Sequence, residues 1–463
     1  MLEDFEAMSV AFGNWAWGSQ LLILLVGGGC FFLIYSRLLP LRYIKHGIDI
    51  LRGKYDDKDA PGDISHFQAL ASAMAGTVGL GNIAGVAVAF AMGGPGAIFW
   101  MWLSAIIGIA TKFFTCSLAV MYRGRDSEGN LQGGPMYVIT EGLGPKWKPL
   151  AMFFCIVAMF GVLPIFQTNQ LLQVTRDVIM IPNGLLEAGG DHFVFNLVFG
   201  LVMMMIVALV VIGGIKRIGS VASRIVPVMI VLYLGAAMYV IFSHIGEVPG
   251  HLMSIVEGAF SAQAAGGGLL GVMIIGIRRA AFSNEAGIGT EAMAHGAAKT
   301  QEPIREGLVA MLGPIIDTLL VCTATAMVIM ISGVYEQSGL TGITLTAAAF
   351  DKTMPTFGTY ILMVCVVFFS ISTVFTMAYY GTKCAGFVFG AHRQHYYNYF
   401  YLAMIIVGAV ASLKAVISLI DGMYAMMAIP TMVSALLLAP KVMVKAREYF
   451  AKFEADKKRL KEA

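Results

Sequence analysis

Long apolar runs with few or no charges recur along the whole chain, and they constrain its fold more than any other feature. Several of these runs extend about 20 residues, the length of a helix that crosses a hydrocarbon core about 30 Å thick. Charged residues make up 13% of the 463 residues, whereas soluble domains carry about 25%. These observations predict an all-α polytopic membrane protein and exclude a soluble globular domain.

Eleven candidate membrane spans can be counted, and the basic residues between them predict an orientation. Cytoplasmic loops are enriched in lysine and arginine. With the N-terminus outside, 25 of the 31 basic residues fall in inner segments and three fall in outer ones. The sequence therefore predicts a multi-pass protein of the plasma (inner) membrane with a cytoplasmic C-terminus. The predicted spans are residues 16–36, 68–92, 97–121, 149–175, 193–214, 222–243, 264–298, 306–333, 358–382, 397–413 and 422–440.

The second span carries a cluster of glycines at its centre, in the stretch MAGTVGLGNIAG (residues 74–85). A nucleotide-binding glycine loop would need a β-strand before it and an aqueous α/β domain around it, and here both flanks are membrane segments. Irregular backbone survives in a membrane only where it is buried or lines a cavity. Close packing of helices is the other explanation for such glycines. This stretch alone leaves a broken helix and tight packing both open.

A second interruption, five spans later, favours the broken helix. The seventh span runs into FSNEAGIGTE (residues 282–291), a polar run that no helix would expose to lipid. Interrupted helices at corresponding places in two halves of a chain point to a transporter site near the bilayer midplane. Because five spans carry the chain to the opposite face, the two blocks would be inverted repeats. The predicted 1 + 5 + 5 organisation has a first helix with a basic cytoplasmic loop (1–65), two five-helix repeats (66–243 and 244–440) and a cytoplasmic tail (441–463).

The chain resembles the alanine or glycine:cation symporter family (AgcS), which has the leucine-transporter type of fold. The most specific match is GGPGAIFWMWLSAIIG (residues 93–108), and GTVGLGN, QGGPMYVI and FSNEAGIGT occur in the expected order. The resemblance implies sodium-coupled import of a small neutral amino acid, alanine or glycine, by alternating access. It implies no enzymatic activity, no organic cofactor, no nucleic-acid partner and a monomer in the lipid bilayer. A proton-coupled symporter of the same fold and an ion channel are the alternatives.

The resemblance also implies a substrate site between the two interruptions. Free amides at the first break would face the substrate carboxylate, and the backbone of the second would face its amine or side chain. Gln167 and Gln170 share one face of the fourth span and suit either substrate contact or helix packing. The expected substrate-binding residues are Thr77, Gly79, Leu80, Gly81, Gln167, Gln170, Phe282, Ser283, Gly287 and Phe369.

A sodium site is implied between the first break and the ninth span. In this fold one sodium lies between carbonyls of the first break and a Ser/Thr pair, which falls on the ninth span here. Hydroxyls that bond back to the preceding helical turn are the alternative explanation. Carried over, the ligands are the carbonyls of Ala75, Val78 and Phe369 and the hydroxyls of Ser372 and Thr373. A second sodium at Thr77 and Asn82 is a further candidate.

Four ionisable residues fall in or near the membrane, where such residues are rare and usually paired. They are Arg278, Arg279, Glu285 and Glu291. Because Arg279 and Glu285 share the second broken helix, we expect them to form a structural or gating pair. Binding of a cation or a proton by Glu285, or no specific role for these residues, are the alternatives.

Overall fold

The computed structural model describes residues 2–57, 59–261, 268–336, 339–340, 342–410 and 414–462. Residues 264–267 of the seventh predicted span, residues 411–413 of the tenth and Lys58 of the first basic loop lie outside these ranges. Helices dominate the described residues, which confirms the all-α class. The exception is a short antiparallel hairpin of β1 (Gly124–Arg125) and β2 (Leu131–Gln132), in which Gly124 pairs with Gln132.

Helices follow one another closely through both halves of the chain. In the first half they are α1 (Leu2–Ala16), α2 (Ser19–Tyr35), α3 (Leu39–Arg42), α4 (Ile44–Leu51), α5 (His66–Thr77), η1 (Gly81–Gly85), α6 (Val86–Gly93), α7 (Gly96–Met121), α8 (Pro135–Tyr137), η2 (Val138–Leu143), η3 (Pro145–Trp147), α9 (Lys148–Gly161), α10 (Ile165–Val174), η4 (Thr175–Met180), α11 (Phe193–Val211) and α12 (Gly214–Ser243). In the second half they are α13 (Val248–Phe260), α14 (Gly268–Asn284), α15 (Thr290–His295), α16 (Pro303–Ala310), α17 (Leu312–Pro314), η5 (Ile315–Cys322), α18 (Thr323–Ser332), η6 (Val334–Glu336), α19 (Gly342–Thr353), α20 (Gly358–Phe389), η7 (Ala391–Arg393), α21 (Gln394–Val410), α22 (Lys414–Met426) and α23 (Ala428–Glu462).

Eight helices or continuous helical runs of the described residues are long and apolar enough to cross a membrane. They match the first, third to sixth, eighth, ninth and eleventh predicted spans. A ninth crossing is the bent pair of α5 with η1 and α6 at the second predicted span. The seventh and tenth predicted spans are occupied by α14 and α21, which are shorter, at 17 residues each. Helices therefore stand at all eleven predicted positions, although eight or nine qualify by length and composition.

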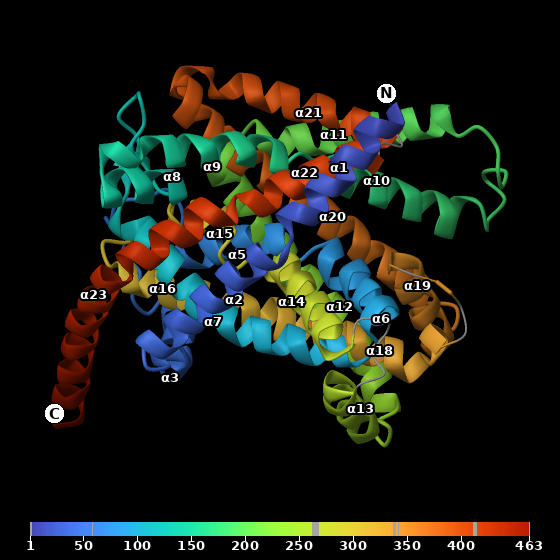
Figure 1. Cartoon of the computed structure of the whole chain (residues 1–463), viewed down its shortest axis with the longest axis horizontal. Helices are drawn as coiled ribbons and strands as arrows, with labels where there is room; N and C mark the ends of the chain where they lie inside the picture. Colours follow the sequence, from blue (N-terminus) through green and yellow to red (C-terminus); the bar gives the residue numbers. More distant parts are fainter. Residues whose placement is uncertain are drawn as a thin grey trace.

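Several long helices, among them α7, α9 and α11, run nearly horizontally in Figure 1, and others, such as α14 and α20, cross them obliquely. The α11 helix packs against α21, α12 packs against α5 and α20, and α7 packs against α14 and α16. The C-terminal part of α23 extends away from the bundle at one end, and α19 lies at the opposite end (Figure 1). Large apolar side chains stay exposed along α11 and α12, among them Val194 and Val231. An exposed apolar belt of this extent is expected of helices that face lipid.

Among the described helices longer than ten residues, three lie almost wholly outside the predicted spans. They are α1, before the first span, α13, between the sixth and seventh, and α19, between the eighth and ninth. The α1 helix packs closely on α22. A Cβ atom on Gly13 would lie 2.8 Å from the carbonyl oxygen of Ser418, so the two backbones approach without room for a side chain. Glycines that permit such contacts are typical of membrane helix pairs.

The end of the bundle at which α5 begins is closed by contacts between the two broken helices. Ile64 forms a parallel bridge with Ala298, just after α15. Nε of Arg123 donates to the carbonyl oxygen of Gly296 at 2.8 Å. The carboxylate of Glu306 hydrogen-bonds Nδ1 of both His66, at the start of α5, and His295, at the end of α15. The two broken helices are thus held together at this end. The side chains involved are His66, Arg123, His295 and Glu306.

Candidate functional site

The first broken helix bends by 53° between α5 and the segment from η1 to α6. The α5 helix ends at Thr77, and Val78 is extended, with φ −76° and ψ 93°. The side-chain oxygen of Asn82 accepts a hydrogen bond from the amide of Gly79 at 2.9 Å, so it holds the turn that follows Val78. A broken second span is therefore confirmed. The break is buried in protein, which meets the requirement that irregular backbone in a membrane avoid lipid.

The second broken helix runs from α14 to α15 across residues 285–289. Three residues of this connection have a positive φ: Glu285 at 55°, Gly287 at 86° and Gly289 at 103°. Glycine takes this conformation without steric cost, so the AGIG run explains the sharp turn. The Asn284 side chain accepts from the amide of Ala286 at 3.1 Å. The polar run thus forms the predicted second break, and it lies in the protein interior.

Asp317 on η5 connects the two breaks, and it was not among the residues predicted from the sequence. Oδ1 of Asp317 accepts from Nδ2 of Asn82 at 2.6 Å, in the first broken helix. Oδ2 accepts from Oγ of Ser283 at 2.9 Å, in the second, and from Oγ1 of Thr318 at 2.8 Å. The signal that could have revealed it is a single carboxylate in the apolar run GPIIDTLLVC, because ionisable residues within membrane spans are rare and functional.

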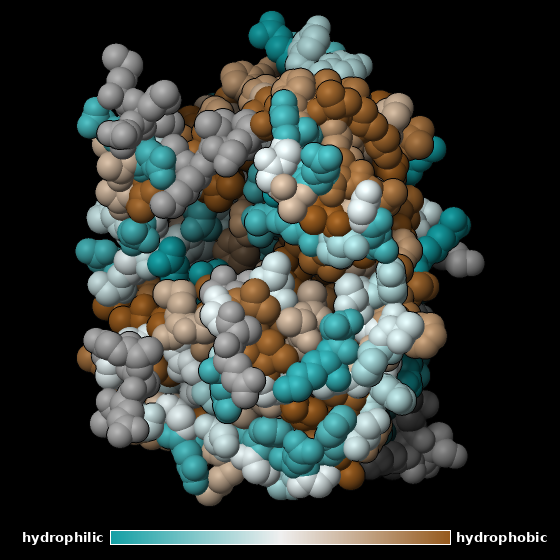
Figure 2. All heavy atoms as spheres, turned by 90° about the vertical axis from the view of Figure 1, so that its right-hand side faces the viewer, coloured by the Kyte–Doolittle hydropathy of each residue, from teal (hydrophilic) through white to brown (hydrophobic). Residues whose placement is uncertain are grey.

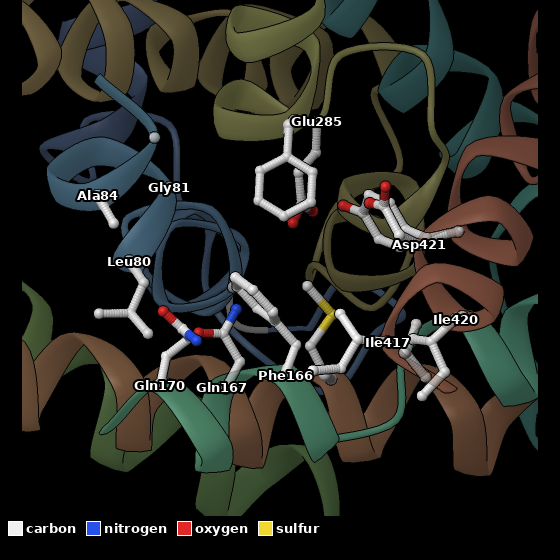
Figure 3. A pocket seen from close by; sticks show the side chains of 18 of the residues that line it. Leu80, Gly81, Ala84, Phe166, Gln167, Gln170, Glu285, Ile417, Ile420 and Asp421 are labelled. Carbon is white, nitrogen blue, oxygen red and sulfur yellow. The ribbon is translucent and has the colours of Figure 1, made fainter. Parts of the chain in front are cut away.

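A cavity of about 360 Å³ lies beside both breaks. Gln167 and Gln170 point from α10 toward the first break, and Glu285 and Asp421 lie across the cavity from them (Figure 3). Gly342, the first residue of α19, is also in the lining, and the face on that side of the molecule is hollowed near its centre (Figure 2). Seven of the ten predicted substrate residues line the cavity, namely Thr77, Gly79, Leu80, Gly81, Gln167, Gln170 and Phe282.

The other three predicted substrate residues lie behind the cavity wall. Ser283 donates to Asp317, as described above. A Cβ atom on Gly287 would meet the side chains of Met432 and Leu25, so this glycine packs against α23 and α2. Phe369 is fully buried on α20, with its ring 5.5 Å from that of Tyr233.

Many of the residues that line the cavity were not among the predicted substrate residues, and α22 contributes more of them than any other helix. Its contributions are Ile417, Ser418, Ile420, Asp421 and Tyr424, and α10 adds Phe166. Part of α22 falls before the eleventh predicted span, in a stretch with no glycine cluster. Asp421, an acidic residue in this apolar stretch, was the feature of the sequence that could have indicated a place in the cavity wall.

Of the predicted sodium residues, Thr373 lies directly against the first break, and the neighbouring Ser372 hydroxyl also lies 3.7 Å from the sulfur of Met229 on α12. A Cβ atom on Gly79 would lie only 2.8 Å from Oγ1 of Thr373. The hydroxyls of Ser372 and Thr373 both donate to the carbonyl oxygen of Phe369, at 3.1 and 2.8 Å. The bonds back to the helical turn are therefore present, and the hydroxyl lone pairs stay available to a cation. Ala75 and Val78 are fully buried at the end of α5.

Thr77 and Asn82, the second candidate sodium pair, differ in their surroundings. The Thr77 hydroxyl is buried and has no hydrogen-bond partner among the described residues. Both polar atoms of the Asn82 side chain have partners, namely the Gly79 amide and Asp317.

The ion pair at the mouth of the second break is not the expected one. Nη2 of Arg278 lies 3.9 Å from Oδ2 of Asp421, and its guanidinium lies 5.7 Å from the centre of the Trp17 ring. Arg279 lines the cavity, and no ion pair joins it to Glu285 in the described part of the chain. The predicted Arg279–Glu285 pair is therefore wrong for this conformation, because α22 supplies a carboxylate to the neighbouring arginine.

Comparison with known proteins assigns the chain to a transporter family. The sequence profile of the "Sodium:alanine symporter family" matches residues 2–463. The chain is 38% identical to the "Sodium/alanine symporter AgcS" of Methanococcus maripaludis, over 96% of this chain and 97% of that protein. It is 36% identical to the "Probable sodium/glutamine symporter GlnT" of Bacillus subtilis, with 95% and 90% covered. The "Amino-acid carrier protein AlsT" of B. subtilis is 32% identical, with 90% and 87% covered.

The fold is also shared with a solved transporter structure. The crystal structure of MhsT in complex with L-phenylalanine superposes with a TM-score of 0.51 at 14% identity, covering 83% of this chain and 98% of that one. At this identity the match concerns the fold alone. It confirms the predicted leucine-transporter type of fold.

Proposed function

The chain belongs to the sodium:alanine symporter family, and on that premise we propose that it imports a small neutral amino acid, alanine or glycine, together with sodium. Amino-acid:cation symport follows from the family. The choice of alanine or glycine and of sodium is our proposal. The observation that carries it is the cavity between the two broken helices, which contains seven of the ten residues expected to bind substrate.

We place the substrate carboxylate at the first break. Gly79, Leu80 and Gly81 line the cavity where α5 has ended and η1 begins. The start of a helix presents amides without intrahelical partners and a partial positive charge, and both favour an anion. Across the cavity, Gln167 and Gln170 present side-chain amides toward the same break (Figure 3). Phe282 adds an apolar wall that suits a methyl side chain.

We place one sodium between the first break and α20. The carbonyls of Ala75, Val78 and Phe369 and the hydroxyls of Ser372 and Thr373 would provide oxygens without a net charge. Unwound backbone and helix ends are the usual sodium ligands in transporters of this kind. The close approach of Gly79 to Thr373 supports this site, because a bound cation there would hold the broken helix against α20. A second cation at Thr77 and Asn82 would have Asp317 as its counter-charge.

Alternating access accounts for the unequal ends of the molecule. One end is closed by the contacts of His66, Arg123, His295 and Glu306, and the cavity reaches Gly342 on α19, on the side where we propose that it opens. We propose that the open face is extracellular, in agreement with the distribution of basic residues. Sodium entry driven by a membrane potential of about 100 mV is worth about 2.3 kcal/mol, enough for about 50-fold accumulation of substrate.

The test is uptake of radiolabelled alanine by the purified protein in proteoliposomes. Four conditions separate the candidates: an inward sodium gradient, an inward proton gradient, both together, and neither. We expect saturable uptake that requires sodium and is inhibited by glycine. Uptake driven by the proton gradient alone would identify the proton-coupled alternative, and an unsaturable conductance would identify a channel.

A further inference from the structure

Glu285 stands at the second break with its carboxylate directed into the cavity (Figure 3). Its side chain is 3% exposed, and its backbone has a φ of 55°. A non-glycine residue in this conformation is strained, and such strain concentrates at functional sites. The fold therefore holds a buried acid at this point of the cavity wall at some cost to the backbone.

The carboxylate of Glu285 lacks a positive partner. Oγ1 of Thr290 donates to Oε2 of Glu285 at 2.5 Å. The Tyr424 hydroxyl lies beside the same carboxylate without forming a hydrogen bond of good geometry. Within the described part of the chain, no lysine, arginine or histidine lies within ion-pair distance of Glu285, including Lys112 on α7 and Arg279 on its own helix. Burial of an unpaired carboxylate is strongly unfavourable.

The other buried acids nearby are placed differently. Asp317 accepts hydrogen bonds from three neutral side chains and does not line the cavity. Asp421 lines the cavity but lies 3.9 Å from the guanidinium of Arg278. Glu291 is fully buried outside the cavity, and its Oε1 accepts from Thr115 at 3.2 Å. Glu285 is thus the acid that combines access to the cavity with the lack of a cation.

We propose that Glu285 binds the α-ammonium group of the transported amino acid. This inference rests on the proposed function and assigns one residue to one group of the substrate. An ammonium has three donors, which the Glu285 carboxylate, the Tyr424 hydroxyl and the carbonyls at the end of α14 can accept. The Ala281 carbonyl accepts from the Glu285 amide, which leaves the carbonyls of residues 282–284 for the ammonium. The Glu285 and Tyr424 side chains both border the cavity, where a substrate ammonium would reach them.

The spacing of the two breaks suits a substrate whose two charges stand on one carbon atom. A Cβ atom on Gly81 would lie 3.6 Å from Cα of Ser283, so the breaks are in contact at this level. The amides of Leu80 and Gly81 and the carboxylate of Glu285 therefore border the same cavity, whereas the Gly79 amide is bound to Asn82. An analogue that lacks the ammonium would leave Glu285 buried and unpaired, and sites of this kind reject such analogues strongly.

The experiment compares L-alanine with L-lactate, which has a hydroxyl in place of the ammonium. Sodium-dependent uptake of radiolabelled alanine, and its inhibition by lactate or propionate, are measured in proteoliposomes for the wild type, E285Q, E285D and E291Q. For the wild type we expect lactate to inhibit at least 100-fold less well than alanine. E285Q should raise the KM for alanine at least tenfold and reduce the preference for alanine over lactate to less than tenfold. E285D keeps the charge and should keep the preference, and E291Q removes a neighbouring buried charge outside the cavity and should keep both values.

The outcomes separate this inference from the proposed function. Absence of sodium-dependent alanine uptake by the wild type would overturn the proposed function. Normal uptake by the wild type with lactate as effective as alanine would overturn the role of Glu285 alone, whether or not the variants fold. A wild-type KM for alanine in E285Q would also overturn the role of Glu285. A change only in the sodium concentration for half-maximal uptake would overturn it too, and would make Glu285 a sodium ligand.

Discussion

Gly79→Ala tests the contact between the first break and α20. The new Cβ atom would lie 2.8 Å from Oγ1 of Thr373, inside the 3.4 Å at which ordinary contacts begin. Thr373 can move its oxygen away only by giving up its 2.8 Å hydrogen bond to the carbonyl of Phe369. Loss of such a bond costs about 1 kcal/mol, and overpacking a buried site costs about 1–3 kcal/mol. We expect Gly79→Ala to destabilise the protein by about 2–4 kcal/mol.

The same substitution should be tolerated when Thr373 is alanine. With Oγ1 removed, the nearest remaining atoms to the new Cβ are Cβ of residue 373 at 3.9 Å and the Phe369 oxygen at 4.0 Å. The two changes should therefore interact by about 1–3 kcal/mol, as contacting residues do in double-mutant cycles.

The assay is thermal unfolding of the four purified proteins in detergent: wild type, Gly79→Ala, Thr373→Ala and the double variant. Gly85→Ala on the same broken helix is the control, because a Cβ atom there would have no described atom within 4 Å. We expect a large drop in melting temperature for Gly79→Ala in the wild-type background and a small one in the Thr373→Ala background. Equal drops in both backgrounds would refute the close approach that supports the sodium site.

Three further predictions follow from single contacts. Thr373→Ala should raise the sodium concentration for half-maximal uptake, whereas Thr382→Ala, farther along α20, should not; an unchanged value for Thr373→Ala would remove it from the ion site. Asp317→Asn should lower the stability measured in detergent by about 1.5–3 kcal/mol, because it replaces an acceptor of charge-assisted hydrogen bonds, and a neutral effect would contradict the role of Asp317 as a connector. Burial lowers the pKa of His46, on α4 outside the membrane spans, to about 4. The contribution of this neutral imidazole to the free energy of unfolding is therefore complete above pH 6.5 and declines as the pH falls toward 4. His46→Phe should flatten the dependence of stability on pH between 6.5 and 4, and an unaltered slope would contradict the assignment.

Local patterns allowed much of the fold to be predicted. A run of 20 apolar residues must cross the bilayer as a helix, since its backbone can find partners in no other way. Glycines at residues 76, 79 and 81 and the run FSNEAGIGT marked the two breaks for the same reason. These signals lie within single segments, so a sequence alone contains them. The boundaries of the two predicted repeats stay a prediction.

The partners of side chains could not be predicted in the same way. Asp317 is 235 residues from Asn82 and 34 from Ser283, and only the folded chain brings the three together. Arg278 pairs with Asp421 across 143 positions, which displaced the expected pair of Arg279 with Glu285. Residues of α22 reach the cavity because that helix packs against α1 and α9, and no periodicity in the sequence reports such packing.

Alanine-stimulated entry of radioactive sodium tests the central claim most directly. Proteoliposomes that contain the purified protein are loaded with sodium-free buffer, and ²²Na⁺ entry is followed with and without external L-alanine, with the membrane potential clamped. Symport predicts that alanine accelerates ²²Na⁺ entry, that the effect saturates with alanine, and that Thr373→Ala requires more sodium for it. Entry of ²²Na⁺ that is independent of alanine, or alanine uptake with no accompanying ²²Na⁺, would contradict coupled transport through this site.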